Sequence, residues 1–155
     1  MATQYTIEPL TDPRFNDVVL WEEIIGPGVP HSRDVVSLSA SITATLKQGT
    51  VLWRAKAKTA TATWDVVNDD TDVNVANEYA ILIGDDRKTA DTVAVSSGVA
   101  KNVIALTRRA HVKDKTIRDI TVTGFGVSTT EFNNLKRLLA TQGVIVSDTL
   151  TAITA

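Results

Sequence analysis

Apolar and polar residues alternate strictly between Val36 and Leu46. Every second residue of this stretch is apolar, and serine or threonine occupies each position between. A two-residue period is typical of a strand with one face buried and the other in water. After Lys47-Gln48-Gly49 an extended pattern resumes over Thr50–Ala55. A short link that contains glycine between two such runs predicts a β-hairpin.

Further short strands are predicted after this hairpin. A strand is expected over Thr59–Val66 with Trp64 facing inward, followed by a polar loop at Asn68–Asp72. Tyr79–Ile83 is a continuous apolar run, as in strands that are buried on both faces. The remaining predicted strands are Thr92–Val95, Asn102–Thr107, Ala110–Val112, Ile117–Thr123 and Val144–Val146.

One helix is predicted, between Ser128 and Gly143. Ser128 with Glu131 three residues later is the pattern of a capping box, and Gly143 is a natural stop. The large apolar residues of this segment fall on one helix face: Phe132, Leu135, Leu138 and Leu139. Many short strands with one late helix predict a mainly β domain with α+β character. We expect a small β-barrel, a β-tulip-like barrel or a sandwich.

The first 34 residues differ from the rest of the chain. Proline and glycine interrupt them at Pro9, Asp12-Pro13, Gly26-Pro27-Gly28 and Pro30. Only Val18–Trp21 is a candidate for a short strand. The sequence therefore predicts an extended N-terminal arm over residues 1–34 and a β-rich domain over residues 35–155. Trp21 is interpreted either as a core residue or as an anchor on a partner.

Composition excludes several classes of protein. A chain of 155 residues is one domain by length, and the absence of cysteine excludes disulfides, thiol nucleophiles and zinc–thiolate sites. No apolar run approaches the roughly 20 residues needed to span a bilayer, and the N-terminus lacks the pattern of a signal peptide. The net charge of −2 provides no general attraction to nucleic acid or membranes. We expect a soluble protein that stays where it is made, without membrane or direct nucleic-acid contact.

Charge is distributed unevenly along the chain. Residues 65–91 hold eight acidic and two basic side chains, a net charge of −6. Residues 101–120 hold six basic and two acidic side chains, a net charge of +4. These runs are interpreted either as solvated loops and strand edges, or as an acidic loop of one copy that meets a basic strand of another.

Candidate metal ligands do not form a motif. His31 and His111 are 80 positions apart, without the spacing of a ligand pair, so structural or surface roles are expected. Asp70-Thr71-Asp72-Val73-Asn74 begins like a calcium-binding EF-hand loop. However, Val75 stands at the position of the required glycine and Ile81 at that of the bidentate glutamate. This segment is therefore predicted to be a solvated turn.

Other motifs also fail their context tests. Gly26-Pro27-Gly28 and Gly124-Phe125-Gly126 do not continue as a dinucleotide fingerprint, and neither opens a predicted strand–helix–strand unit. Arg108-Arg109 is too short for a nucleic-acid patch. We expect no catalytic, cofactor or metal site.

Three segments, taken in order, resemble the head-decoration proteins of lambda-type tailed bacteriophages. They are Gly49–Leu52, Ala80–Asp85 and Val103–Val112. In that family a Gly-Thr-Val-Leu strand precedes an Ala-Ile-Leu strand with an acidic loop after it, and a Val-Leu-x-Arg-x-Ala-x-Val strand follows. The resemblance spans roughly residues 46–140. The chain differs from the simplest members in its long N-terminal part, Met1–Thr45, and in Arg109, where many members have glycine.

The resemblance implies a capsid cementing protein that is not an enzyme. Such proteins bind the outer surface of an expanded icosahedral head as homotrimers and clamp the major capsid protein against the pressure of packaged DNA. An N-terminal segment joins capsid strands by β-augmentation. The location implied is the outer surface of the virion, after synthesis in the host cytoplasm. The residues expected to contact the capsid are Val18, Val19, Leu20 and Trp21, and those expected at the trimer contact are Asp85, Asp86, Arg108 and Arg109.

Two alternatives remain at this point. The first is another phage structural role on a similar small β-domain, such as a tail or head-completion protein, which would bind at a ring rather than across a shell. The second is an enzyme or a small-ligand binder in the mouth of a barrel, which would need polar residues that converge on a pocket.

Overall fold

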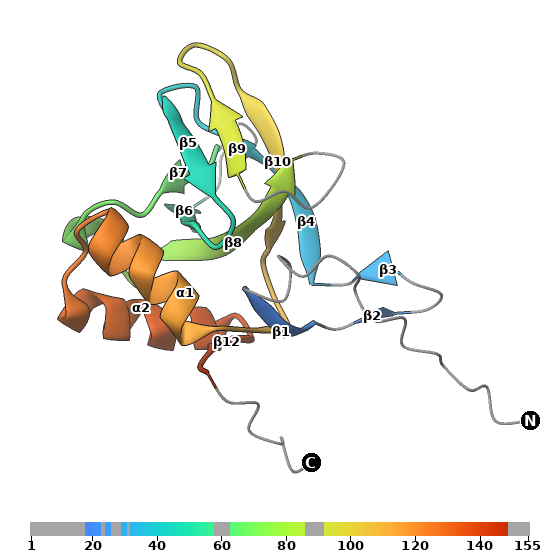
Figure 1. Cartoon of the computed structure of the whole chain (residues 1–155), viewed down its shortest axis with the longest axis vertical. Helices are drawn as coiled ribbons and strands as arrows, with labels where there is room; N and C mark the ends of the chain where they lie inside the picture. The colour runs from blue at the N-terminus through green and yellow to red at the C-terminus, as the bar shows by residue number, and fades with distance from the viewer. Residues whose placement is uncertain are drawn as a thin grey trace, which may run out of the picture.

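The computed structural model describes residues 18–22, 24–25, 29–30, 32–57, 63–85 and 92–148. These residues form a five-stranded sheet, a three-stranded sheet and two two-stranded ribbons, with the helices gathered at the lower left of Figure 1. The prediction of a mainly β domain with α+β character is confirmed.

The strands and helices have the following bounds. The strands are β1 Val19–Glu22, β2 Ile24–Ile25, β3 Val29–Pro30, β4 Arg33–Leu38, β5 Ala44–Lys47, β6 Val51–Ala55, β7 Asp65–Val66, β8 Asn77–Asp85, β9 Thr92–Val95, β10 Lys101–Leu106, β11 Ala110–Val112 and β12 Val144–Val146. The helices are α1 Asp114–Arg118 and α2 Thr129–Thr141, with a 3-10 turn, η2, at Asp70–Asp72 and a π-helical segment, η3, at Asp119–Gly124. No helix among these residues has the length and apolar character to cross a membrane.

Strand β8 is the centre of the five-stranded sheet, whose order is β4-β10-β8-β6-β7. Its residues from Tyr79 to Gly84 are buried, which confirms the prediction of a strand covered on both faces. Ala80 and Leu82 pack into one apolar cluster with Leu52, Trp64 and Val103. The alternate residues of β8 pack into a second cluster with helix α2: Tyr79, Ile81 and Ile83 against Phe132, Leu135 and Leu139. Two cores on opposite faces explain why the run is continuously apolar.

The strands of the described residues do not close into a barrel, so the expectation of a closed β-barrel is not met. The two edges of the five-stranded sheet approach each other at one isolated parallel bridge, between Leu38 at the end of β4 and Trp64 directly before β7. There the Trp64 N–H donates to the Ser37 carbonyl at 2.8 Å, and the Ser39 N–H donates to the Trp64 carbonyl at 2.7 Å. Trp64 is only 3% exposed, as predicted.

The predicted hairpin around Gly49 is wrong. Strand β4 ends at Leu38, and a turn follows in which the Ser39 and Ser41 hydroxyls lie 2.7 Å apart. Strand β5 then pairs with β9, whereas β6 pairs with β8 and β7. Serine hydroxyls that bond locally favour a turn, and the alternation of apolar residues continues through it unchanged. Gly49, with φ +95°, then turns the chain from one sheet into the other.

The predicted helix is confirmed as α2. The Ser128 hydroxyl accepts from the Glu131 N–H at 3.2 Å, and Gly143 follows the helix with φ +82°. By contrast, the strand predicted at Ile117–Thr123 is wrong, because these residues lie in α1 and η3. Both helices belong to the connection between the parallel strands β11 and β12. Tertiary packing, which buries Ile117 completely, overrides the strand propensity of this β-branched segment.

Part of the predicted N-terminal arm belongs to the folded body. Strand β1 pairs antiparallel with β11, with Val19 opposite Val112 and Trp21 opposite His111. Strand β4 begins at Arg33 and pairs with β10. Residues 1–17 lie outside the described residues, and so does the part of the predicted Thr59–Val66 strand before Thr63.

Candidate functional site

Two of the residues expected to contact a capsid lie in the core. Val18 and Val19 are 2% and 4% exposed and pack in the cluster that includes helix α2. Leu20 is half-buried. The Trp21 backbone lies in register with His111, and its side chain is outside the described structure. Val18 and Val19 therefore present no side-chain surface to a partner while the chain stays folded, which corrects the expected mode of contact.

The residues expected at a trimer contact are separated within one chain. Arg108 forms a bidentate pair with Asp34, with Nη1–Oδ2 at 2.6 Å and Nη2–Oδ1 at 2.9 Å, and this hydrogen bond raises the pKa of Arg108. Asp85 pairs with Val103, five positions before Arg108, so about 16 Å of chain separates the two charges. Asp86 lies outside the described residues. A contact between Asp85 and Arg108 thus remains a prediction for two copies rather than one.

Arg109 has φ +45°, the only positive φ of a non-glycine residue in the described chain. It follows β10 in the tight connection to β11. The backbone of Arg109 also lies against Gly143, where an added Cβ would come within 3.3 Å of the Arg109 nitrogen. The left-handed backbone at Arg109 is a conformation that favours glycine over other residues.

His111 is part of the three-stranded sheet and is 8% exposed. Its Nε2 atom lies 2.6 Å from the Ser147 hydroxyl. His31 falls outside the described residues. No three His, Asp or Glu side chains gather as metal ligands within the ranges that the structure describes.

The segment that begins like a calcium loop lies between strands β7 and β8 and contacts the start of helix α2. The Asp72 carboxylate accepts from the Asn68 and Asp69 N–H groups at 3.0 and 3.1 Å. The Asp70 carboxylate accepts from the Ser128 N–H at 2.7 Å. These carboxylates therefore hold the turn closed and satisfy a backbone donor at the start of α2.

A polar cleft of about 470 Å³ lies beside β4, and paired charges line it. The pair of Asp34 with Arg108 lines it, and so does the pair of Arg54 with Glu78. The Arg54 guanidinium also lies over the Trp64 ring, 4.5 Å from its centroid. Because each arginine has a carboxylate partner in the same chain, this cleft offers hydrogen bonds more than free charge.

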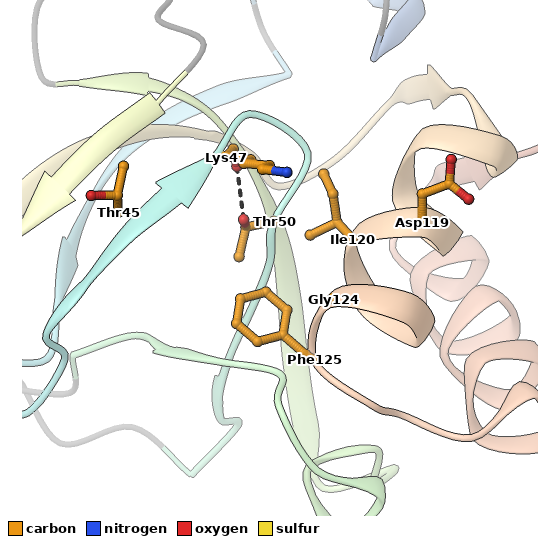
Figure 2. A pocket seen from close by; sticks show the side chains of 7 residues that line it. All are labelled: Thr45, Lys47, Thr50, Asp119, Ile120, Gly124 and Phe125. Carbon is orange, nitrogen blue, oxygen red and sulfur yellow. Dashed lines mark hydrogen bonds between the residues drawn. The ribbon is translucent and has the colours of Figure 1, made fainter.

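A second surface follows strand β5, and one of its two hollows is drawn in Figure 2. This hollow, of about 260 Å³, separates β5 and the turn after it from η3. Ile120 and Phe125 form its apolar side, whereas Lys47 and Asp119 stand at its rim (Figure 2). The Thr50 hydroxyl donates to the Lys47 carbonyl at 2.7 Å and holds the turn in place.

The other hollow, of about 340 Å³, lies beside residues 41–43 and the following residues of β5. Ile42, Leu46 and Val66 contribute its apolar surface, and Asp65 and Asn68 contribute polar groups. Phe125 lines both hollows and is the residue that they share. Sequence analysis missed these hollows because they bring residues 41–50 next to residues 119–125, and no local pattern signals that contact.

Comparison with known proteins identifies no relative: no protein-family model, no curated protein and no solved structure matches this chain.

Proposed function

We propose that this chain is a capsid decoration protein of a tailed bacteriophage. It binds the outer surface of the expanded head as trimers and stabilises the shell against the pressure of packaged DNA. Its partners are the major capsid protein and further copies of itself. It acts by binding and has no catalytic role.

The observation that carries this proposal is the position of the three segments that resemble the decoration family. Gly49–Leu52 leads into β6, Ala80–Asp85 lies in β8, and Val103–Val112 covers the second half of β10 and then β11. Strands β6, β8 and β10 are hydrogen-bonded neighbours, and Ile81 of β8 lies opposite both Val51 and Leu106. The three segments, in the order that the resemblance gives them, thus supply three adjacent strands of one sheet.

The backbone of Arg109 supports the same proposal. Many members of the family have glycine at this position, and Arg109 has φ +45° in this chain. Left-handed backbone is the conformation in which glycine is favoured. The chain thus differs from the family in side chain but has the backbone geometry that a glycine there would fit.

Edge strands offer a physical means of attachment. Within the described ranges, strand β1 stands at the edge of the sheet order β1-β11-β12, with β11 as its one strand neighbour. Unpaired main-chain groups at such an edge can accept or donate hydrogen bonds to a strand of another protein. We therefore place the capsid contact of Val18–Trp21 in the β1 main chain rather than in the buried valine side chains. Many symmetric copies strengthen contacts that are weak singly.

Co-sedimentation with undecorated capsid shells tests the proposal. Purified protein is mixed with compact and with expanded shells from the phage whose genes flank the coding sequence, and bound copies are counted. We expect saturable binding to expanded shells only, at about one copy for each capsid subunit, as a symmetric surface lattice requires.

Other outcomes would overturn it. Binding to neither form of shell would contradict the proposal. A copy number of about a dozen in each particle would indicate a ring-shaped site, and with it a tail or head-completion protein.

A further inference from the structure

A polar layer lies at one end of the apolar core that faces away from helix α2. Four strands supply this core with buried residues, among them Val36 of β4, Leu52 of β6, Ala80 of β8 and Ala105 of β10. Alternate residues of a strand share a face, so the next side chains on this face, at the same end of all four strands, are polar: Asp34, Arg54, Glu78 and Thr107. All four line the cleft of about 470 Å³ beside β4. The cleft is therefore the polar mouth of this core.

The strands around the mouth diverge. The pairing of β10 with β8 ends where Leu106 lies opposite Ile81, whereas β8 continues to Asn77 in its pairing with β6. Within the described ranges, β4 and the chain before β7 meet at one bridge, between Leu38 and Trp64. The polar mouth thus lies where the strand pairing is incomplete, which leaves room for a ligand.

Two arginine–carboxylate pairs line the cleft, one deeper than the other. The side chains of Arg54 and Glu78 are 23% and 19% exposed, whereas those of Arg108 and Asp34 are 38% and 40% exposed. The Arg54 guanidinium rests on the buried Trp64 ring. The Thr107 hydroxyl donates to Asp34 Oδ2 at 2.5 Å and accepts from Arg108 Nη1 at 3.0 Å. Because these contacts hold both pairs in place beforehand, a ligand would bind with little cost of side-chain ordering.

The charges of the cleft select against an ion. Its lining holds two arginines and two carboxylates, so its formal net charge is zero. An anion that approached either guanidinium would be repelled by the carboxylate of the same pair, and a cation would meet the reverse. A hydroxyl both donates and accepts, so two neighbouring hydroxyls can accept from the guanidinium and donate to the carboxylate of one pair. The complementary ligand is a neutral compound with adjacent hydroxyls.

We propose that this cleft binds a neutral sugar ring, either as a free monosaccharide or as the terminal residue of a glycan. Adjacent hydroxyls of the ring bridge Arg54 and Glu78, and further hydroxyls reach Asp34 and Arg108 nearer the opening. The volume of about 470 Å³ lies within the range of about 300–1,000 Å³ that is usual for small-molecule sites. None of the described residues that line the cleft belongs to β1, so this binding does not depend on the proposed capsid contact.

Titration of the full-length protein with sugars, followed by NMR, tests the site. The panel consists of glucose, galactose and mannose, the methyl α- and β-glycosides of each, and acetate and phosphate as anions. The Nε–Hε signals of the arginine side chains and the amide signal of Thr107 report on the cleft. Asp34→Asn and Glu78→Gln each keep the shape of the side chain and remove one carboxylate. The control is Asp119→Asn, because Asp119 is also paired with a basic residue, Lys115, but lies outside the cleft.

We expect at least one sugar to shift the Nε–Hε signals of Arg54 and Arg108 and to saturate with a Kd on the order of 1 mM. Asp34→Asn and Glu78→Gln should each weaken binding about tenfold, because hydrogen bonds to a charged carboxylate are stronger than those to an amide. Asp119→Asn should bind within about twofold of the natural chain. Binding of a methyl glycoside would support a glycan terminus as the ligand, and binding of the free sugars alone would support a monosaccharide.

Three results would overturn the proposal. The first is no shift at sugar concentrations about tenfold above that Kd, and the second is a set of shifts confined to residues outside the cleft. The third is tighter binding of acetate or phosphate than of every sugar, which would make the cleft an anion site. If one carboxylate variant does not fold, the other still applies, and the shifts in the natural chain need neither. Because no capsid shell enters this experiment, its outcome is independent of the capsid test.

Discussion

At the scale of single residues, two side chains set the local geometry around the helical connection. Arg109 holds a left-handed backbone at the end of β10. Asp114 lies at the start of α1, where its carboxylate accepts hydrogen bonds from Lys136 of α2 and from Arg118 at 3.1 Å. The Arg118 guanidinium also lies 4.8 Å from the centroid of the Phe132 ring, so the two helices are joined by charge and by packing.

Replacement of Arg109 should separate backbone strain from side-chain contacts. Arg109→Gly and Arg109→Ala both remove the side chain, but only glycine adopts φ +45° without steric cost. We expect the glycine variant to be more stable than the alanine variant by about 1 kcal/mol in urea unfolding. Equal stability of the two variants would mean that the turn relaxes to an ordinary conformation when the arginine is absent.

Asp114 should contribute stability that depends on pH. Burial raises the pKa of Asp114, but the hydrogen bonds from Lys136 and Arg118 outweigh this effect, and the net pKa is lowered. A carboxyl with a lowered folded pKa stabilises above its unfolded pKa of about 4, and that contribution is lost as pH falls through the folded value. Asp114→Asn should therefore cost about 1–3 kcal/mol at pH 7.

The difference in free energy of unfolding between Asp114→Asn and the natural chain should become smaller in acid. Urea unfolding at a series of pH values from neutral to about 3 measures it. The control is Asp119→Asn, which removes the exposed Lys115–Asp119 pair and should cost under about 0.5 kcal/mol. A difference for Asp114→Asn that stays constant with pH would contradict the assigned pairing.

At the scale of elements, helix α2 is attached at both of its ends to the segment that runs from η2 into β8. The N–H of Ser128, the residue that caps α2, donates to the Asp70 carboxylate of η2. At its other end, the Gln142 side-chain amide accepts from the Tyr79 N–H and donates to the Tyr79 carbonyl, each at 2.9 Å. The pairing of β8 with β10 ends at Ile81, two residues away from Tyr79. The two bonds from Gln142 therefore satisfy main-chain groups of β8 that β10 does not reach. The Gln142 amide thus replaces a missing strand neighbour.

Replacement of Gln142 should open this attachment. Gln142→Leu removes both hydrogen bonds and leaves the Tyr79 main-chain groups without a partner, so we expect a loss of about 2–3 kcal/mol. Amide hydrogen exchange should show the Tyr79 N–H losing protection. Thr141→Ala, one residue earlier on the exposed surface, serves as control and should change stability by under about 0.5 kcal/mol. Retained protection at Tyr79 in the leucine variant would contradict this role.

At the scale of the whole molecule, two apolar cores lie on opposite faces of the five-stranded sheet. Strand β1 contributes to the core on the side of the helices. One core lies between the sheet and the helices and includes Val18, Val19 and the three-stranded sheet. The other lies on the opposite face and includes the β5–β9 ribbon. A predicted boundary at residue 34 would cut through both sheets, because β1 precedes it and β4 crosses it.

Truncations should reveal where the folded body begins. Deletion of Met1–Asp17 removes none of the described contacts and should leave the free energy of unfolding within about 0.5 kcal/mol. Deletion of Met1–Glu22 removes two buried valines and an edge strand, and it should cost at least about 3 kcal/mol. Urea unfolding of the two truncated chains compares them directly. Equal stability would mean that β1 contributes nothing to the core.

Local sequence patterns were sufficient to predict the elements in which burial follows one regular period from end to end. The alternation and the apolar runs predicted β8, β9, β10, β11 and β12, because burial on a sheet follows a period of two residues. The cap at Ser128 and the stop at Gly143 predicted α2, because both act within one helical turn. The mainly β class with one late amphipathic helix could therefore be derived from sequence alone.

Contacts between distant residues decided the rest. Strand β5 pairs with β9 and strand β6 pairs with β8, so β5 and β6 belong to different sheets. The stability of a strand pair depends on both strands and on their surroundings, so the sequence of one strand does not predict its partner. Ile117–Thr123 became helical because the crossover from β11 to β12 had to bury Ile117. The two hollows beside β5 exist only because Phe125 lies beside residues 41–50. A sequence encodes the periodicity of burial locally, but which surfaces meet depends on the packing of the whole chain.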